Sequence, residues 1–387
     1  MAPRTIVVGA GILGIAVAER LAASGDRVTL VDRAAPGGGT SRTSFGWLNA
    51  NGKVPRSYHD LNVAGVAAYR RLVGDPDVAA WLHLEGRLQW AESPADIDSL
   101  EREALAMRAW DYPVEAITAD AARRLEPDLR IGPGAEVRFW PSEGFVVPDL
   151  LLAWLLRRAG SRGVEVIRDA RVTGFHVRGG AVAGVRLDGG NSLEGERVVV
   201  CVGRWSEALL AEVGVRVPMQ PVTAGSAALG LLGYTGRAAA RLRRTISNPG
   251  LNVRPDGDVG RFVLQGIGLD GLADPDVPPD PAGVIAMELL TRAQASLAGF
   301  DEARLDELRV GYRAVPADRL TVAGWAPGVD GLYVVATHSG FTLALHLGEL
   351  IAAEIGEGVS ERSLADFRPT RFKDPVDLVE TAGRPIH

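Results

Sequence analysis

The glycine pattern near the N-terminus is the feature that most constrains the fold of this chain. Residues 6–8 read Ile-Val-Val, a β-branched run typical of a buried parallel strand. Gly9, Gly11 and Gly14 follow with the spacing G-x-G-x-x-G. After a strand, such glycines permit a tight turn, the approach of a pyrophosphate to the backbone, and close packing of the next helix. The pattern therefore predicts a parallel βαβ unit with an anion-binding site at the helix N-terminus.

The residues after the glycines indicate which anion this site binds. The predicted helix ends at Gly25, and residues 28–31 form a second apolar strand that Asp32 closes. Asp32 lies about 20 residues beyond the glycines, where a carboxylate accepts hydrogen bonds from a ribose and repels a 2′-phosphate. An ordinary βαβ unit with glycines for packing alone is the alternative, and it gives Asp32 no role. The predicted dinucleotide-binding residues of this segment are Gly9, Gly11, Ile12, Leu13, Gly14, Asp32 and Arg33.

Composition narrows the class of protein. The chain has 387 residues, too many for one small domain and suited to two interleaved domains. Its formal net charge of -6 favours neither nucleic acid nor an anionic membrane surface as a partner. Cys201 is the single cysteine, which excludes an internal disulfide and a cysteine metal cluster. The histidines are scattered without metal-binding spacing, so no metal site is predicted.

The apolar segments do not indicate membrane insertion. The N-terminal apolar run is interrupted by its glycines and contains Glu19 and Arg20, unlike a signal peptide. The longest other run, Leu-Leu-Leu-Ala-Trp-Leu-Leu, is too short to span a bilayer. These features predict a soluble cytoplasmic protein.

The rest of the chain departs from the repeated βα units of NAD enzymes. A loop rich in glycine and hydroxyl residues follows Asp32, and periodicity then predicts a strand over residues 82–90. Three strand-like runs between residues 170 and 203, joined by glycine turns, predict a β-meander. Helices are predicted over residues 60–73, 95–110 and 283–297, a helix and strand within 145–167, and a strand, glycine turn and long helix within 331–355.

This order of elements predicts an α/β fold: a Rossmann-like nucleotide-binding domain with an inserted, mainly antiparallel β-sheet domain of α+β type. The nucleotide-binding domain is assigned to residues 1–59, 143–215 and 310–387. The inserted domain, residues 60–142 and 216–309, is assigned to substrate.

Several ordered motifs resemble one known family. They are the opening glycine motif, Val-Val-Val-Cys-Val-Gly-Arg-Trp-Ser at 198–206, the segment beginning Gly-Tyr-Arg-Ala-Val at 311, and Thr-His-Ser-Gly-Phe-Thr at 337–342. Together they resemble the FAD-dependent D-amino-acid oxidase, glycine oxidase and sarcosine oxidase superfamily. The resemblance covers most of the chain in order, although the middle domain matches only loosely. It is specific for the superfamily and for no single member.

The resemblance implies an extended FAD with Asp32 on the adenosine ribose. Gly340 begins a helix whose N–H groups would face the flavin and stabilise negative charge on it. A capped loop at residues 41–44 and a simple helix entry at Gly340 are the alternatives. FAD is expected to be non-covalent, because the cysteine that holds flavin in related enzymes lies near the C-terminal motifs, unlike Cys201. The further residues expected to bind FAD are Thr40, Ser41, Arg42, Thr43, Ser44, Val172, Gly203, Trp205, Gly340, Phe341 and Thr342.

The chemistry that the resemblance implies is oxidation of an amine or amino acid. Hydride passes from the substrate α-carbon to flavin N5, the imine hydrolyses, and oxygen or another acceptor takes the electrons. Arg313 is expected to anchor a substrate carboxylate through two parallel hydrogen bonds, or else is a surface arginine on a strand edge. Trp47 and Asn49 are candidates for the wall beside the flavin, with a core tryptophan as the alternative. His338 either tunes the flavin or contacts substrate, or is a structural histidine.

One departure from the family pattern keeps other functions open. Sarcosine oxidases carry a lysine above the flavin that promotes reaction with oxygen, but the matching strand here reads Arg-Phe-Val-Leu-Gln-Gly at 261–266. A dehydrogenase with another acceptor, an NAD-dependent dehydrogenase, and a binding or assembly factor without turnover therefore remain alternatives. Arg254 and Arg261, which flank a predicted hairpin, are interpreted as belonging to a solvated turn.

Overall fold

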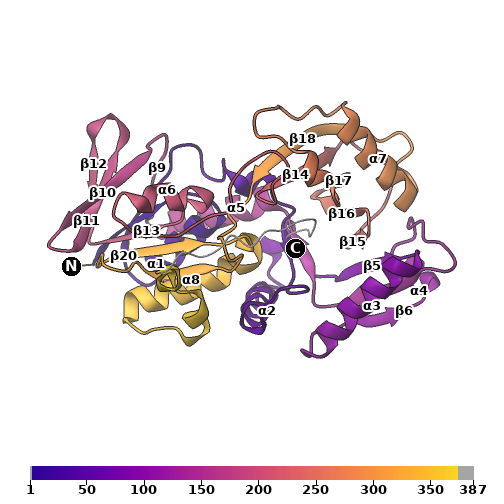
Figure 1. The fold of residues 1–387 in the computed structure, drawn as a ribbon, viewed down its shortest axis with the longest axis horizontal. Helices are drawn as coiled ribbons and strands as arrows, with labels where there is room; N and C mark the ends of the chain where they lie inside the picture. The colour runs from indigo at the N-terminus through magenta and orange to yellow at the C-terminus, as the bar shows by residue number, and fades with distance from the viewer. Residues whose placement is uncertain (1, 374–387) are drawn as a thin grey trace. The chain divides into compact units, whose positions relative to one another are not determined.

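The computed structural model describes residues 2–373, which divide into two compact units. Figure 1 shows the ribbon coloured by residue number. Of the described residues, the first unit contains 2–42, 149–221 and 312–373, and the second contains 43–148 and 222–311. The predicted fold class, a Rossmann-like α/β part with an inserted, mainly antiparallel sheet, is confirmed.

The unit boundaries differ from the predicted domain boundaries at their edges. The short strands β3 (Trp47–Leu48) and β8 (Gly144–Val146) pair with β4 (Leu82–His83) in one three-stranded sheet. This pairing groups residues 43–59 and 143–148 with the second unit, although the sequence placed them in the nucleotide-binding domain. Residues 216–221 lie with the first unit instead, where Met219 bridges to Pro316.

The first unit is built on a six-stranded sheet. Its order is β19 (Val322–Trp325), β20 (Leu332–Ala336), β13 (Arg197–Val200), β1 (Arg4–Val8), β2 (Arg27–Val31) and β9 (Glu165–Ile167). Every neighbouring pair is parallel except β19 with β20. Because the chain leaves β1 toward β2 and later returns to β13 on the other side, the strand order reverses at β1. Ligands of such sheets bind at the carboxyl ends of the strands at this reversal.

Two long helices pack against each other beside β1. They are α1 (Ile12–Ala23) and α8 (Gly340–Glu357). A Cβ atom at Gly348 of α8 would lie 3.0 Å from the carbonyl oxygen of Ala16, so the missing side chain lets the helices approach closely. At their N-terminal ends, a Cβ atom at Gly340 would lie 3.4 Å from Cγ2 of Ile12. The two helix N-termini are therefore neighbours.

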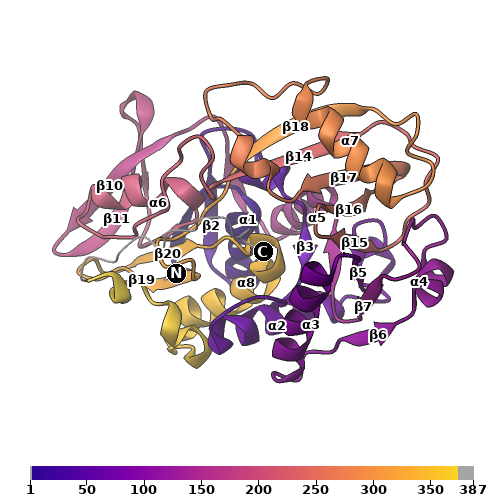
Figure 2. The same cartoon turned by 45° about the vertical axis from the view of Figure 1, so that its right-hand side comes forward.

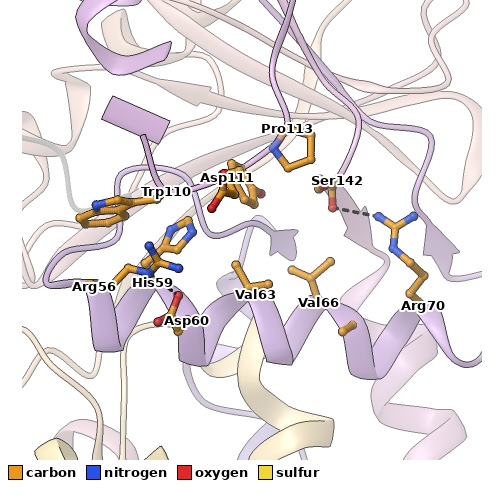
Figure 3. A pocket seen from close by; sticks show the side chains of 12 residues that line it. Arg56, His59, Asp60, Val63, Val66, Arg70, Trp110, Asp111, Pro113 and Ser142 are labelled. Carbon is orange, nitrogen blue, oxygen red and sulfur yellow. Dashed lines mark hydrogen bonds and ion pairs between the residues drawn. The ribbon is translucent and has the colours of Figure 1, made fainter. Parts of the chain in front are cut away.

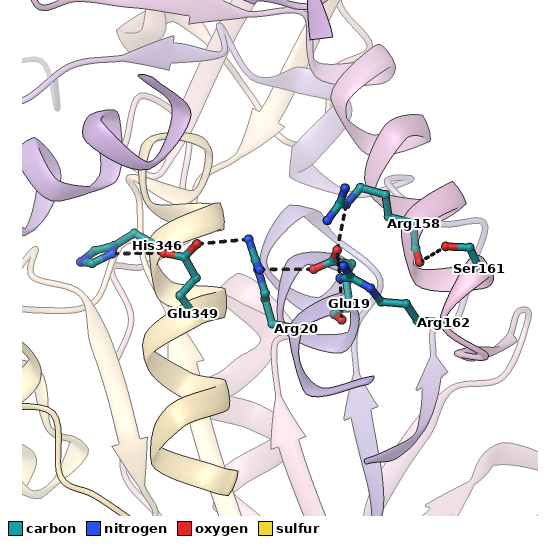
Figure 4. Close-up of polar contacts among 7 residues, drawn as sticks. All are labelled: Glu19, Arg20, Arg158, Ser161, Arg162, His346 and Glu349. Atoms are coloured by element: carbon teal, nitrogen blue, oxygen red, sulfur yellow. Dashed lines mark hydrogen bonds and ion pairs between the residues drawn. The ribbon is translucent and has the colours of Figure 1, made fainter. Parts of the chain in front are cut away.

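A cluster of charges joins these helices to α5 (Pro148–Ser161), as Figure 4 shows. Glu19 of α1 is 2% exposed and lies 2.8 Å from Nε of Arg158, with Arg162 as a second partner. Arg20 lies 3.4 Å from Glu19 and 3.1 Å from Glu349 of α8. The buried carboxylate is thus surrounded by arginines from two helices.

A small antiparallel sheet follows α5 in the first unit. It contains β10 (Val172–Arg178), β11 (Ala181–Leu187) and β12 (Ser192–Glu194). The predicted meander is wrong in its third strand, because β12 completes this sheet whereas β13 runs parallel to β1. Only three residues long and mostly exposed, β12 carries no apolar run. By contrast, β13 is the continuous buried run expected of a parallel strand.

The second unit is built on an eight-stranded sheet. Its order is β18 (Leu305–Tyr312), β14 (Leu229–Thr235), β17 (Asp258–Gly266), β16 (Leu251–Asp256), β15 (Thr245–Asn248), β5 (Arg87–Ala91), β7 (Glu136–Trp140) and β6 (Glu115–Ile117). Figure 2 shows α7 (Val284–Ser296) over β16 and β17, while α3 (Pro94–Arg108) packs on β5 and β7. The single strand predicted over residues 82–90 is wrong: it is β4 and β5, separated at Gly86 with a φ of 91°.

The remaining α-helices are distributed over both units. They are α2 (Arg56–Arg70) and α4 (Ala119–Leu125) in the second unit and α6 (Ser206–Ala211) in the first. Within residues 2–373, no helix combines the length and apolar character needed to cross a bilayer.

Candidate functional site

The glycine motif forms a turn in which side chains have no room. Gly9 has a φ of 99°, and a Cβ atom there would lie 2.6 Å from the carbonyl oxygen of Cys201. A Cβ atom at Gly14 would lie 1.8 Å from the carbonyl oxygen of Gly9. The first glycine is therefore required for the turn and the third for the close packing of α1, as the sequence predicts.

The N-terminus of α1 is suited to an anion. Gly11 is its N-cap and supplies no side chain, and the first turn carries no acidic residue. The buried Ser41 hydroxyl accepts a hydrogen bond of 3.0 Å from the backbone N–H of Ile12. A Cβ atom at Gly11 would lie 3.2 Å from the same hydroxyl oxygen. A positively polarised helix end without a charged side chain in its first turn is suited to a pyrophosphate.

Asp32 is held in place by the backbone around it. Its Oδ2 accepts from the N–H of Ala10 at 2.6 Å, and its Oδ1 accepts from the N–H of Ala34 at 2.9 Å. The Asp32 N–H donates to Ile167 and its carbonyl accepts from Ala170, each at 3.0 Å. Each carboxylate oxygen keeps a further lone pair, which a ribose hydroxyl can use.

The loop after Asp32 is positioned by residues from distant parts of the first unit. The Arg33 guanidinium lies 4.0 Å from the centre of the Trp205 ring. The Thr40 hydroxyl donates to the carbonyl oxygen of Tyr312 at 2.5 Å, and Arg42 lies 3.8 Å from Asp149. The first of these contacts places Arg33 against the turn that contains Gly203 and Trp205. Val172 is the first residue of β10, two residues after Ala170.

The N-terminus of α8 resembles that of α1. Ser339 is its N-cap without a side-chain cap bond, and the first turn, which contains Phe341 and Thr342, has no acidic residue. Ser339 N–H donates to Oγ1 of Thr337 at 3.1 Å, which fixes the turn after β20. The half-buried His338 lies in this turn. Arg313 is also half-buried. It belongs to the first unit and directly follows β18, a strand of the second unit's sheet.

The other predicted site residues lie in the second unit. Ser44 accepts a hydrogen bond of 3.1 Å from the N–H of Gly46, next to Thr43. Trp47 of β3 packs against Phe45 with 5.4 Å between ring centres, and Asn49 is 5% exposed. The structure therefore gathers the predicted residues into two groups, one in each unit.

One face of the second unit's sheet carries an unusual row of polar side chains. The strand registers place Arg87, Ser247, Asn252, Arg254 and Gln265 on the same face. All are buried except the half-buried Gln265, whose Oε1 accepts from Nδ2 of Asn252 at 3.1 Å. Such burial of polar groups is costly unless they are hydrogen-bonded, as Asn252 and Gln265 are to each other.

The solvated-turn interpretation is wrong for Arg254. Its side chain is fully buried and donates to the carbonyl oxygens of Phe45 and, at 2.6 Å, Pro255. Asp256 lies 2.9 Å from its guanidinium and balances its charge. Arg261 is exposed at 44% and pairs with Asp306, as a surface residue does.

Sequence reasoning missed a buried ion pair behind Trp47. Glu143 is fully buried, and its Oε2 lies 2.8 Å from Nε of Arg87, which is 4% exposed. The hydroxyl of Tyr112 donates to Oε1 of Glu143 at 3.4 Å and accepts from the N–H of Ala50 at 3.2 Å. No motif links these residues, because each comes from a different part of the chain. Nothing in the sequence around each of them marks it as buried or paired.

A small pocket borders this cluster, as Figure 3 shows. Its volume is about 210 Å³, and it lies between α2 and the loop after α3. His59, Trp110 and Tyr112 form part of its wall, and both His59 and Tyr112 also contact the backbone of Ala50. Burial lowers the pKa of His59, and so favours its neutral form.

Comparisons with known proteins agree with this geometry. A family model described as FAD dependent oxidoreductase, DAO, matches residues 4–354. A glycine oxidase from Bacillus licheniformis is 27% identical over 377 residues, which is 95% of this chain and 97% of that protein. The crystal structure of glycine oxidase from Geobacillus kaustophilus aligns with a TM-score of 0.81 at 24% identity, covering 96% of this chain and 100% of that one. L-proline dehydrogenase from P. horikoshii aligns with a TM-score of 0.81 at 17% identity, covering 96% of this chain and 98% of that one.

Proposed function

The chain belongs to the DAO family of FAD-dependent oxidoreductases, and on this premise we propose that it oxidises a C–N bond of an amino acid or secondary amine. The observation that carries the proposal is the pair of adjacent helix N-termini, of α1 and α8, neither with an acid in its first turn. This arrangement suits FAD, which carries negative charge on its central pyrophosphate and, when reduced, on the flavin ring. Glycine oxidase and 4-methylaminobutanoate oxidase among the relatives support the substrate class.

The residues of the first unit fit FAD. Gly11 brings no side chain to the N-terminus of α1, where the pyrophosphate would bind beside the Ser41 hydroxyl, and Asp32 presents a fixed carboxylate to the adenosine ribose. Thr40, Ser41 and Arg42 supply hydroxyl and guanidinium donors on the adjoining loop. We assign these residues to non-covalent binding, because Cys201 is buried directly after β13, against the glycine turn at Gly9 where the pyrophosphate, not the flavin, would bind.

The remaining roles follow from side-chain chemistry. When bound, FAD would supply the hydride acceptor for the carbon beside the substrate nitrogen, leaving an imine. Arg313 would bind and orient a substrate carboxylate with its planar guanidinium. The N–H groups of Gly340, Phe341 and Thr342 would favour negative charge at the start of α8. Trp47, Asn49 and His338 are assigned as further cofactor or substrate contacts.

The first test is spectroscopic. The purified protein should be yellow, and acid precipitation should release its flavin into the supernatant. Anaerobic addition of amino acids and N-methyl amines should then identify a substrate that bleaches the visible bands. A protein that is colourless and takes up no added FAD, or whose flavin no amine reduces, would contradict the proposal.

Arg313→Leu tests the carboxylate anchor. It should raise KM by at least about 10-fold for a carboxylate substrate, since about 1.4 kcal/mol is lost with such a contact. KM for a simple amine of similar shape should stay unchanged. Arg157→Leu, at an exposed position of α5, is the matched control and should leave both KM values unchanged.

A dehydrogenase is the second candidate, and Gln265 favours it. This residue lies in the strand where sarcosine oxidases carry the lysine that promotes reaction with oxygen, and its amide is neutral. Reduced protein mixed with oxygen should then reoxidise more slowly than with an artificial acceptor such as a quinone. Faster reoxidation by oxygen would identify an oxidase.

A further inference from the structure

We propose that Arg87, Glu143 and Tyr112 are positioning residues that set the conformation of residues 47–51. This inference rests on the proposed function, because that function assigns Trp47 and Asn49 to cofactor or substrate contact. All these residues belong to the second unit, so their contacts are defined within one compact body.

The Arg87–Glu143 pair lies directly behind Trp47. The guanidinium carbon of Arg87 lies 5.1 Å from the ring centre of Trp47 and 5.1 Å from that of Trp140. Glu143 lies 2.8 Å from the same guanidinium, and neither charged side chain reaches solvent appreciably. A buried guanidinium packed on an indole attracts the ring strongly. The position of Arg87 therefore influences that of Trp47.

Residues 50 and 51 are held by the same cluster and its neighbours. The Ala50 N–H donates to the Tyr112 hydroxyl at 3.2 Å, and the Ala50 carbonyl lies 2.9 Å from Nδ1 of His59. Asn51 donates to Oε1 of Glu103 at 2.5 Å, and Gln89 donates to Oε2 of the same carboxylate at 3.0 Å. The segment is thus fastened to β5, α2, α3 and the loop after α3.

Charge makes this arrangement sensitive to pH. Burial raises the pKa of Glu143 to about 7, and the nearby Glu103 adds to the rise while Arg87 opposes it. The groups that face Glu143 are Arg87 from β5, Glu103 from α3, Trp47 from β3 and Tyr112. Burial keeps the pKa of Tyr112 well above its ordinary value, so the phenol stays neutral while Glu143 titrates.

The neighbouring pocket adjoins the cluster through Tyr112. This residue lines the pocket, and its hydroxyl donates to Glu143 at 3.4 Å, although Tyr112 is only 4% exposed and Glu143 is fully buried. Protonation of Glu143 removes the negative partner of Arg87 while the guanidinium keeps its charge. Arg87 then moves relative to Trp47, and the segment follows.

The direct test observes Trp47 without any substrate. In protein labelled with 5-fluorotryptophan, the ¹⁹F resonance of Trp47 is identified by its loss in Trp47→Phe. It should shift with a midpoint near pH 7, and Glu143→Gln should abolish the shift. Glu126→Gln is the matched control, since Glu126 is another buried carboxylate of this unit, paired 3.0 Å from Arg244 and away from residues 47–51. A Trp47 resonance that does not titrate, or that titrates equally in Glu143→Gln, would overturn the proposal.

A second variant covers the case in which Glu143→Gln fails to fold. Arg87→Met combined with Glu143→Leu replaces the pair by apolar groups of similar size, a change that folded proteins often tolerate. The double variant should fold and lose the titration of Trp47. Retention of that titration in the folded double variant would count against Glu143 as its source.

The kinetic test uses the substrate found for the proposed function. The rate constant of flavin reduction in the wild type should change several-fold around pH 7, and Glu143→Gln should flatten this profile with FAD affinity unchanged. Failure of any amine to reduce the flavin would defeat the proposed function, while the ¹⁹F titration would still decide the positioning role. A pH profile that Glu143→Gln leaves unaltered would defeat the positioning role alone.

Discussion

A Cβ atom at Gly14 would lie 1.8 Å from the carbonyl oxygen of Gly9, a distance at which the backbone itself would have to move. Gly14→Ala should therefore lower the free energy of unfolding by about 3 kcal/mol or more. Gly160→Ala in α5 is the matched control, since nothing lies within 4 Å of its Cβ position and helical alanine is favoured by up to about 1 kcal/mol. Urea unfolding of both variants measures the difference. Equal stability of the two would show that α1 can move away from β1.

Asp32 allows a graded test of cofactor binding. Asp32→Ala leaves the Ala10 and Ala34 N–H groups without their acceptor and removes the ribose contact. The Kd of the Asp32→Ala variant for FAD should be at least about 10-fold higher than that of the wild type, equivalent to about 1.4 kcal/mol. Asp32→Asn keeps one oxygen acceptor and should fall between the wild type and Asp32→Ala. Titration of the apoprotein with FAD gives the three values, and any other order would argue against the ribose contact.

The charge cluster of Figure 4 predicts unequal effects for two glutamates. Glu19→Gln removes the negative charge that Arg20, Arg158 and Arg162 surround, and it should destabilise the protein by about 2 kcal/mol. Glu349→Gln is the control, because that carboxylate is 32% exposed and its pair with Arg20 is worth about 0.5 kcal/mol. The melting temperature of Glu19→Gln should be well below that of Glu349→Gln. Similar melting temperatures would mean that solvent screens the buried cluster as well.

Glu143 predicts how stability depends on pH. Its pKa is raised from 4.5 to about 7, so the folded state binds a proton more tightly than the unfolded state does. The stability contributed by this proton is complete below the unfolded pKa and is lost as the pH rises through the folded pKa. Between about pH 5 and about pH 8 the loss is about 2 kcal/mol. Over this pH range the free energy of unfolding, measured with urea, should fall by about 2 kcal/mol more in the wild type than in Glu143→Gln. An equal change in the two proteins would exclude the shift.

Local patterns predict much of the first unit. The glycines, the β-branched run before them and the acid after β2 act over short distances, so the βαβ unit and the start of α8 follow from the sequence. A strand such as β12 could not be predicted, because three mostly exposed residues carry neither periodicity nor an apolar run. The break in the strand at Gly86 could not be predicted either. The lack of space for a side chain there depends on Phe139 and Trp140 of another strand.

Long-range pairing explains what the sequence did not reveal about the site. Arg254 follows a strand-like run next to a glycine turn, which is also how an exposed hairpin arginine appears. One of the acceptors that compensate its burial, the carbonyl of Phe45, lies far away in the sequence. The ion pair of Glu143 with Arg87 likewise could not be predicted, because the sequence around one residue does not identify the other as its partner.

The contact between Ala16 and Gly348 has a consequence for synthesis of the protein. The ribosome completes α1 before the second unit, but α8 and the neighbouring strand β20 emerge only after it. Until then the apolar side of α1 that α8 covers has no native partner, and β13 lacks its outer neighbour. The nascent chain must therefore hold an unfinished nucleotide-binding unit while the whole second unit is made, which is a state that chaperones recognise. Helix α1 is in this way made before the second unit and acquires its native surroundings only after it.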